Sequence, residues 1–281
     1  MPFKILKKEE LVQDIHIMDI SAPRIASKAQ PGQFMILRID EKGERIPLTI
    51  ADFDRDKGTI TVIFMVVGKT TMQLASLKAK DELLDFVGPL GLPSEIEKFG
   101  TVLLVGGGVG VAPVYPQARA FKEAGNRVIS IIGARNADLL VWEDKMRDVS
   151  DEMYITTDDG TKGHHGFVTD IVKQILESEE KVDRVVAIGP PVMMRAVAGV
   201  TAPFKVKTVV SLNSIMVDGT GMCGACRVLV GNETKFACVD GPEFDAHLVD
   251  FTLLMNRLAM YQPEEKASLS KYKCEREGCL C

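Results

Sequence analysis

The chain has 281 residues with a formal net charge of −5, and no stretch of it is rich in lysine or arginine. This charge pattern argues against nucleic acid or an anionic membrane surface as the main partner, and the length is typical of two domains with an appendage. The N-terminal residues are charged throughout instead of forming the apolar core of a signal peptide, and no apolar run approaches the ~18 residues of a membrane span. We therefore expect a cytoplasmic protein that does not bind membranes.

Residues 1–97 show the pattern of a small antiparallel β-barrel. Short β-rich runs are separated by Pro-Gly and Lys-Gly turn signals, and no long amphipathic helix interrupts them. The runs lie at 34–39, 47–53 and 59–67. A segment dense in glycine and proline, 87–100, then marks a domain boundary.

Residues 98–210 change to short apolar runs that alternate with helical patterns. This alternation is typical of buried parallel strands joined by crossover helices, so it predicts a five-stranded, doubly wound α/β domain of the Rossmann type. The runs lie at 101–105, 127–132, 153–157, 184–188 and 207–212.

A glycine-rich turn follows the first of these five runs and precedes a predicted helix. It consists of Gly106, Gly107, Gly108, Val109 and Gly110. At such a turn, backbone N–H groups and the helix dipole can meet a pyrophosphate, and glycine permits the close approach. Because no third glycine completes the G-x-G-x-x-G pattern and no acidic residue ends the second run, a tight turn without a ligand stays open as the alternative.

Two further loops fall at the carboxyl ends of later predicted strands, where open α/β sheets bind their ligands. One is Asp158-Asp159-Gly160, and the other begins with Gly189-Pro190. Each of them alone is usually an ordinary turn. Together with the glycine-rich turn, they predict a nucleotide site at this edge of the sheet.

All six cysteines lie after residue 222, which favours a local metal site over a disulfide framework spread through the fold. In the predicted lobe 211–262, Cys223 and Cys226 form a C-x-x-C motif and Cys238 follows a hairpin pattern. A plant-type [2Fe-2S] site uses C-x4-C-x2-C and a distant cysteine. Counting back from Cys223 by that spacing reaches Asp218, whose carboxylate is the candidate fourth ligand.

A zinc site is the alternative for the same three cysteines, with the fourth ligand supplied by His247 or by the tail. The tail, residues 263–281, is polar, and we expect it to be mobile. Its cysteines match no closed site, and we expect them to bind nothing in the isolated chain. They are Cys274, Cys279 and Cys281.

The order of barrel, nucleotide domain and cysteine-rich lobe resembles the ferredoxin–NADP reductase superfamily, in which the barrel binds FAD and the α/β domain binds NAD(P). A short strand motif and a later turn hold the flavin in that superfamily. The matching residues are Pro47, Leu48 and Thr49 of the strand motif, and Gly68, Lys69, Thr70 and Thr71 of the turn. Arg45 lies one residue before the position of the expected arginine. Hydride passes directly between the two cofactors, so no side chain is assigned a catalytic role.

The cysteine-rich lobe makes the resemblance more specific. The architecture is similar to the electron-transfer subunit of dihydroorotate dehydrogenase, which would be expected to carry cysteine at position 218. The run SIMVDGTGMCGACRV, with aspartate at that position, resembles the small subunits of NADH-dependent reduced ferredoxin:NADP oxidoreductases. A dihydroorotate dehydrogenase relay and a zinc-stabilised nucleotide-binding adaptor without redox function stay open as alternatives.

This resemblance implies a heterodimer with a larger subunit that carries its own FAD and [4Fe-4S] clusters and oxidises NADPH. One electron then goes to ferredoxin, and the other passes through the [2Fe-2S] cluster of this chain to its FAD and on to NAD⁺. The implied cofactors of this chain are therefore FAD, a [2Fe-2S] cluster and NAD(H). The preference for NAD(H) rests on the resemblance, because Arg135 near the end of the second apolar run would suit a 2′-phosphate.

Overall fold

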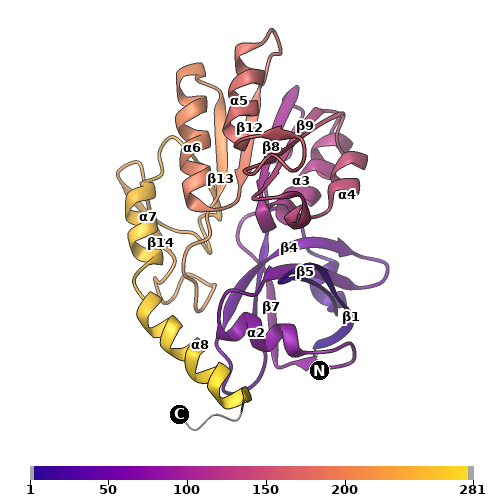
Figure 1. Ribbon diagram of the computed structural model, residues 1–281, viewed down its shortest axis with the longest axis vertical. Helices are drawn as coiled ribbons and strands as arrows, with labels where there is room; N and C mark the ends of the chain where they lie inside the picture. The colour runs from indigo at the N-terminus through magenta and orange to yellow at the C-terminus, as the bar shows by residue number, and fades with distance from the viewer. Residues whose placement is uncertain (1–2, 278–281) are drawn as a thin grey trace.

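The first lobe of the computed structural model, which describes residues 3–277, is an antiparallel barrel (Figure 1). Buried and more exposed side chains alternate along its strands, so each strand turns one face to the core. Within the described residues, seven strands form a nearly closed sheet in the order β6-β1-β2-β5-β4-β3-β7. They are β1 (Phe3–Val12), β2 (Ile15–Ser21), β3 (Phe34–Arg38), β4 (Ile46–Asp54), β5 (Thr59–Met65), β6 (Glu82–Leu83) and β7 (Asp85–Leu90), with helices α1 (Pro23–Ala26) and α2 (Lys69–Ser76).

The second lobe is the predicted doubly wound domain. Its five predicted strands lie in the order β10-β9-β8-β12-β13, and these five are parallel. The short strand β11 (His164–His165) extends one edge and the antiparallel β16 (Glu243–Asp245) extends the other. The five are β8 (Thr101–Gly107), β9 (Arg127–Ala134), β10 (Glu152–Thr157), β12 (Arg184–Ile188) and β13 (Lys207–Ser211).

Helices cover both faces of this sheet, so the side chains of β8 are buried on both sides. Leu103 and Val105 pack against α5 (Val168–Glu177) and α6 (Pro191–Thr201). Val102 and Leu104 pack against α3 (Val111–Glu123) and α4 (Glu143–Asp148). The strand order reverses between the neighbouring strands β8 and β12, because β9 and β10 lie on one side of this pair and β13 lies on the other. Doubly wound folds bind their ligands at this position.

The third lobe contains the predicted hairpin, β14 (Arg227–Val230) and β15 (Glu233–Phe236), followed by β16 and α7 (Phe251–Leu258). Phe251 and Leu254 bury α7 against the same core as α5 and α6. The loops on both sides of the hairpin pack on the barrel, because Met216 and Cys226 before it and Cys238 after it share a core cluster with residues of β3.

The C-terminal segment differs from the sequence-based expectation. The sequence predicted a mobile tail from residue 263, but α8 (Gln262–Glu277) is a helix that runs back to α2 (Figure 1). Acidic residues in its first turn and Arg276 in its last complement the helix dipole, and Lys271 pairs with Glu275 one turn later. Low hydrophobicity is therefore compatible with a helix here. The prediction that the tail cysteines bind nothing also covered Cys279 and Cys281, which lie outside the described residues.

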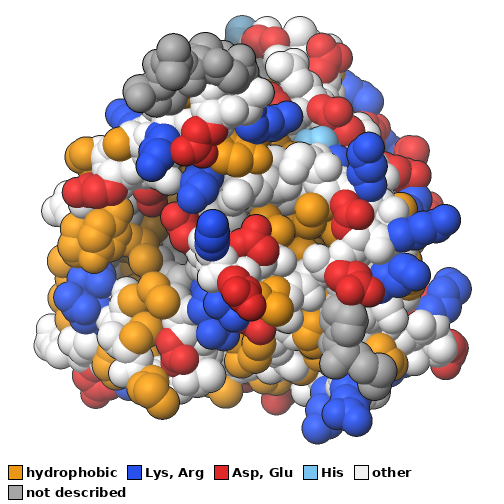
Figure 2. Space-filling model, turned by 90° about the horizontal axis from the view of Figure 1, so that it is seen from below, with side chains coloured by type: hydrophobic (Ala, Val, Ile, Leu, Met, Phe, Trp, Pro, Cys, Tyr) orange, Lys and Arg blue, Asp and Glu red, His pale blue; other side chains and the backbone are white. Residues whose placement is uncertain are grey.

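The surface carries charged side chains of both signs (Figure 2). On the face seen from below, acidic and basic side chains are interspersed (Figure 2). Within residues 3–277, no helix combines the length and the apolar character that crossing a membrane requires.

Candidate cofactor sites

The glycine-rich turn lies where β8 ends and α3 begins. Gly106 and Gly107 close the strand, and Gly108–Gly110 form a single 3-10 turn with α3 starting at Val111. Gly108 has a φ of +56°, and the space where its Cβ would lie is open. A ligand can therefore approach the turn at the start of α3. The structure thus supplies the helix-start geometry that the sequence predicted.

The loop at Gly189-Pro190 lies directly beside this turn. A Cβ added at Gly110 would be 2.2 Å from the carbonyl oxygen of Ile188, and one added at Gly107 would be 2.3 Å from the Sδ atom of Met193. The two loops come from β8 and β12, which are neighbours in the sheet. Met193 was not among the predicted residues, because nothing in the sequence distinguishes it from a helix-packing methionine.

The third predicted loop, Asp158–Gly160, is at the same edge of the sheet but two strands away from the glycine-rich turn. Its N–H groups bond to the end of β9, since Asp158 donates to the carbonyl of Ala134 and Asp159 to that of Arg135, each at 3.1 Å. The hydroxyl and N–H of Thr161 hold the Asp159 carboxylate and keep its pKa below the usual range. All three loops therefore lie at the carboxyl ends of the parallel strands, at one edge of the sheet.

The two predicted flavin motifs are also brought together. The strand motif Pro47–Thr49 belongs to β4, and the turn residues Gly68–Thr71 open α2. The Thr70 hydroxyl donates to Glu44, just before β4, over 3.1 Å. The Thr71 hydroxyl oxygen accepts from the N–H groups of Val67 and Gly68, both at 3.0 Å, and so fixes the start of the helix.

Arg45 is a sign that this region is built for an anion. Its Nε atom is buried and, among the residues that the structure describes, it has no hydrogen-bond partner. A buried N–H without an acceptor is costly, and a phosphate oxygen would satisfy it. Lys69 at the start of α2 adds a second cation. The residues present therefore fit the pyrophosphate of FAD.

The cysteine loop brings two of its sulfur atoms into contact. The Sγ atoms of Cys226 and Cys238 are 3.2 Å apart, and both residues are almost completely buried. The N–H of Gly221 donates to the Cys238 sulfur over 3.1 Å. Burial and the neighbouring Cys226 raise the pKa of the Cys238 thiol to about 12. Two buried sulfurs this close to each other suit a metal centre, which would hold both as thiolates.

Cys223 lies on the exposed side of the same loop, near Asp218. The backbone N–H of Ala225 donates to the Cys223 sulfur and lowers the pKa of the thiol, with a smaller opposing effect from the Asp218 carboxylate. The Asp218 carboxylate accepts from the hydroxyl of Thr220 and from its N–H at 3.0 Å, and these bonds lower its pKa. Within residues 3–277, no three His, Cys, Asp or Glu side chains converge as a site for one metal ion.

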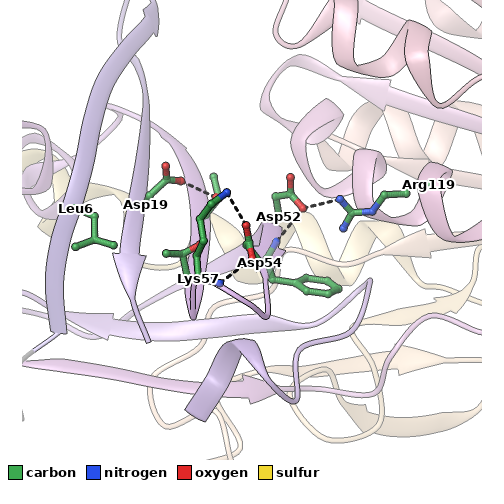
Figure 3. A pocket seen from close by; sticks show the side chains of 9 residues that line it. Leu6, Asp19, Asp52, Asp54, Lys57 and Arg119 are labelled. Atoms are coloured by element: carbon green, nitrogen blue, oxygen red, sulfur yellow. Dashed lines mark hydrogen bonds and ion pairs between the residues drawn. The ribbon is translucent and has the colours of Figure 1, made fainter. Parts of the chain in front are cut away.

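A separate depression of about 390 Å³ lies on the outside of the barrel, and none of the predicted site residues lines it (Figure 3). Each of its carboxylates has a partner: Arg119 pairs with Asp52, Lys57 pairs with Asp54, and the Thr61 hydroxyl donates to Asp19. The depression therefore presents groups that already have partners, in contrast to the unpartnered Nε atom of Arg45.

Sequence reasoning also missed Glu243, which joins the lobes. Its carboxylate accepts from the Ser94 hydroxyl and from the Gln117 amide, each at 2.7 Å. Burial raises the pKa of this carboxyl, and the two hydrogen bonds oppose the shift. No local sequence pattern identifies this contact, because its members come from the linker, α3 and β16.

Two family models match parts of this chain. Residues 213–250 match the family model of the iron-sulfur cluster binding domain of dihydroorotate dehydrogenase B, and residues 104–199 match that of the oxidoreductase NAD-binding domain. The dihydroorotate dehydrogenase B (NAD(+)) electron transfer subunit homolog of Thermotoga maritima is 49% identical, over 96% of this chain and 95% of that protein. The electron transfer subunit of Shouchella clausii is 35% identical, over 85% of this chain and 94% of that protein.

Among solved structures, a chain of the NADH-dependent reduced ferredoxin-NADP oxidoreductase, a structure that addresses flavin-based electron bifurcation, is 48% identical with a TM-score of 0.92. The match covers 97% of this chain and 98% of that chain. These similarities confirm the predicted fold class, with its flavin barrel, nucleotide domain and iron-sulfur lobe.

Proposed function

Since the chain belongs to the family of dihydroorotate dehydrogenase B electron-transfer subunits and their homologues, we propose that it serves a flavin-based, electron-bifurcating NADH-dependent ferredoxin:NADP oxidoreductase. In this enzyme it passes electrons between a [2Fe-2S] cluster, FAD and NAD(H). The observation that carries the proposal is the near full-length similarity to a chain of such an oxidoreductase, at 48% identity. When bound, FAD exchanges single electrons with the cluster and a hydride with the nicotinamide.

The barrel residues bind and orient the flavin in this proposal. Arg45 and Lys69 bind the pyrophosphate, and the start of α2, with Gly68, Thr70 and Thr71, surrounds it with hydrogen-bond donors. The strand motif Pro47–Thr49 holds the flavin against β4. The buried, unpartnered Nε of Arg45 is the feature that supports this placement.

The edge of the α/β sheet binds NAD(H). Gly106–Gly110 and Gly189-Pro190 meet the pyrophosphate at the place where the sheet reverses direction. Asp158–Gly160 serve the part of the nucleotide that lies farther along the edge, and the fixed Asp159 carboxylate disfavours a 2′-phosphate there.

The cluster takes its protein ligands as two pairs. A [2Fe-2S] cluster accepts two protein ligands on each iron. Cys226 and Cys238 are one pair, with sulfurs 3.2 Å apart, and Asp218 and Cys223 on the preceding part of the loop are the other. An aspartate oxygen is a harder ligand than sulfur, so it alters the reduction potential of its iron. The domain division 1–97, 98–210 and 211–262 follows these three sites.

The partner in this proposal is a larger flavin- and [4Fe-4S]-containing subunit that binds NADP(H), and ferredoxin reacts through the complex in the cytoplasm. The relatives described as electron transfer subunits support a heteromeric assembly. The test is isolation of the native complex, with cofactor analysis and an assay of NADPH-driven ferredoxin reduction. Reduction that requires NAD⁺ supports bifurcation, whereas reduction that is indifferent to NAD⁺ refutes it.

The Asp218→Cys variant tests the ligand set directly. We expect it to retain a [2Fe-2S] cluster whose EPR signal and midpoint potential differ from those of the wild type. Asp218→Asn keeps the size of the side chain but weakens the ligand, so it should lower the cluster content. If both variants keep the wild-type spectrum and potential, Asp218 is not a ligand.

A dihydroorotate dehydrogenase complex is the second candidate, because the relatives at 35% identity are its electron transfer subunits. It would use the same cofactors with a different partner. Identification of the co-purifying chain, together with an assay for dihydroorotate oxidation by NAD⁺, separates the two functions.

A further inference from the structure

Two arginines hold the outer side of the loop that carries Cys223 and Cys226. Arg227 donates through Nη1 to the carbonyl oxygen of Gly224 over 3.1 Å, and Arg257 donates through Nη2 to that of Ala225 over 3.0 Å. These carbonyls belong to consecutive peptide groups. We call Arg227 and Arg257 the arginine pair.

Holding these carbonyls fixes the direction of the N–H groups in the same peptides. In a trans peptide the C=O and N–H bonds point to opposite sides. The peptide whose carbonyl Arg227 holds has the N–H of Ala225, and this N–H donates to the Cys223 sulfur. The peptide held by Arg257 has the N–H of Cys226, which therefore points away from Arg257. The arginine pair, together with the backbone N–H of Arg227, which also donates to the Gly224 carbonyl over 3.4 Å, thus holds the carbonyls outward and leaves the N–H of Ala225 at the Cys223 sulfur.

The position of Arg257 is fixed from outside the loop. It lies in the last turn of α7, whose first turn is capped by the Asp250 carboxylate on the N–H of Leu253 at 2.8 Å. The N–H of Asp250 bonds to the carbonyl of Leu229, and Gly231 bonds to that of Leu248, so the hairpin and α7 are joined before the helix begins. Arg257 therefore reaches the loop from an anchored helix.

The charges of the arginine pair are not neutralised nearby. Within the part of the chain that the structure describes, neither guanidinium forms an ion pair with a carboxylate, and their hydrogen bonds go to the loop carbonyls. Arg227 is exposed, whereas Arg257 is partly buried. Screening by water is weaker at a partly buried charge, so Arg257 should act more strongly on the loop.

We propose that the arginine pair positions the cluster loop and raises the reduction potential of its [2Fe-2S] cluster, a role that rests on the ligand set proposed above. Reduction adds an electron to a cluster that is already anionic, and a nearby positive charge stabilises the reduced form. The N–H of Ala225, held at the Cys223 sulfur, acts in the same direction, because hydrogen bonds to sulfur stabilise added negative charge.

The test is an EPR-monitored redox titration of the assembled complex, with iron and sulfide analysis of each variant. We expect Arg257→Gln to keep the cluster and to titrate at a lower potential than the wild type, and Arg227→Gln to shift in the same direction by less. Arg257→Lys keeps the charge and should remain closer to the wild type than Arg257→Gln. Arg24→Gln, which removes an exposed charge from the barrel, should leave the potential unchanged.

The outcomes separate this inference from the proposed function. A wild-type complex without a [2Fe-2S] signal refutes the ligand set, and the inference with it. A wild-type signal with unchanged potentials in Arg227→Gln and Arg257→Gln overturns the role of the arginine pair alone. If Arg257→Gln does not retain a cluster, an unchanged potential in the exposed variant Arg227→Gln is sufficient to overturn it.

Discussion

The Gly110→Ala substitution tests whether the two loops at the reversal of the sheet form one binding site. Its Cβ would lie 2.2 Å from the carbonyl oxygen and 2.7 Å from the carbonyl carbon of Ile188. These are backbone atoms at the end of β12, so they cannot rotate away, and the loops must separate by about 1 Å. Overpacking of this kind costs about 1–3 kcal/mol, and each kcal/mol lowers Tm by about 4 °C in a domain of this size.

Gly107→Ala is the matched control for this substitution. Its Cβ would meet the Sδ atom of Met193 at 2.3 Å, and a flexible thioether moves at a cost below about 1 kcal/mol. We expect Gly110→Ala to lower Tm more than Gly107→Ala and to weaken NADH binding, measured by stopped-flow reduction of the flavin at increasing NADH. A Gly110→Ala protein with wild-type Tm and wild-type NADH dependence would refute the close approach of the two loops.

Two further predictions concern stability. Burial raises the pKa of Glu243, so ionisation of this carboxyl opposes folding. The stability that the protonated side chain contributes is fully present below the ordinary carboxyl pKa and is lost as pH rises through the raised value. Glu243→Gln should remove this pH-dependent loss of stability, and a variant whose Tm-versus-pH curve runs parallel to that of the wild type would contradict the burial argument. Thr71→Ala removes the hydroxyl that accepts from the N–H groups of Val67 and Gly68, so the variant should lose about 1 kcal/mol of stability and bind less flavin. Thr71→Ser keeps the hydroxyl and should restore both the stability and the flavin content of the purified protein. Equal flavin content in all three proteins would contradict a flavin site at the start of α2.

The sequence predicted the features that depend on local pattern. Buried apolar runs gave the five parallel strands at their observed places, because a strand with helices on both faces has apolar side chains on both sides. The glycine-rich turn was predictable for a similar reason, since few conformations connect a strand to a helix so closely. Their spatial order, with β8 between β9 and β12, follows the usual arrangement of doubly wound sheets.

Features that depend on distant partners were not predictable. Helix α8 lacks an apolar face, so its polar composition resembled a mobile tail, although its charges suit a helix. Strand β16 has only three residues and exists because it pairs with β13. Likewise, the bond from Arg257 to the loop joins residues 32 positions apart, and no periodicity in the sequence indicates it.

The linker between the barrel and the sheet explains how three lobes can keep their cofactors at fixed separations. Lobes within one chain commonly move against each other unless polar contacts and packing hold them. Here the N–H of Ser94 bonds to Pro31 of the barrel at 2.9 Å, and its hydroxyl bonds to Glu243 of the iron-sulfur lobe. The next residue, Glu95, pairs over 2.6 Å with Arg184 of β12, whose side chain is almost completely buried. Two consecutive linker residues thus bind all three lobes. Removing the Glu95 carboxylate would leave the buried Arg184 with the backbone carbonyl of Glu95 and the Phe99 ring but without an anion. Loss of the anion beside a buried charge is costly, and this places the control of lobe geometry in the linker itself.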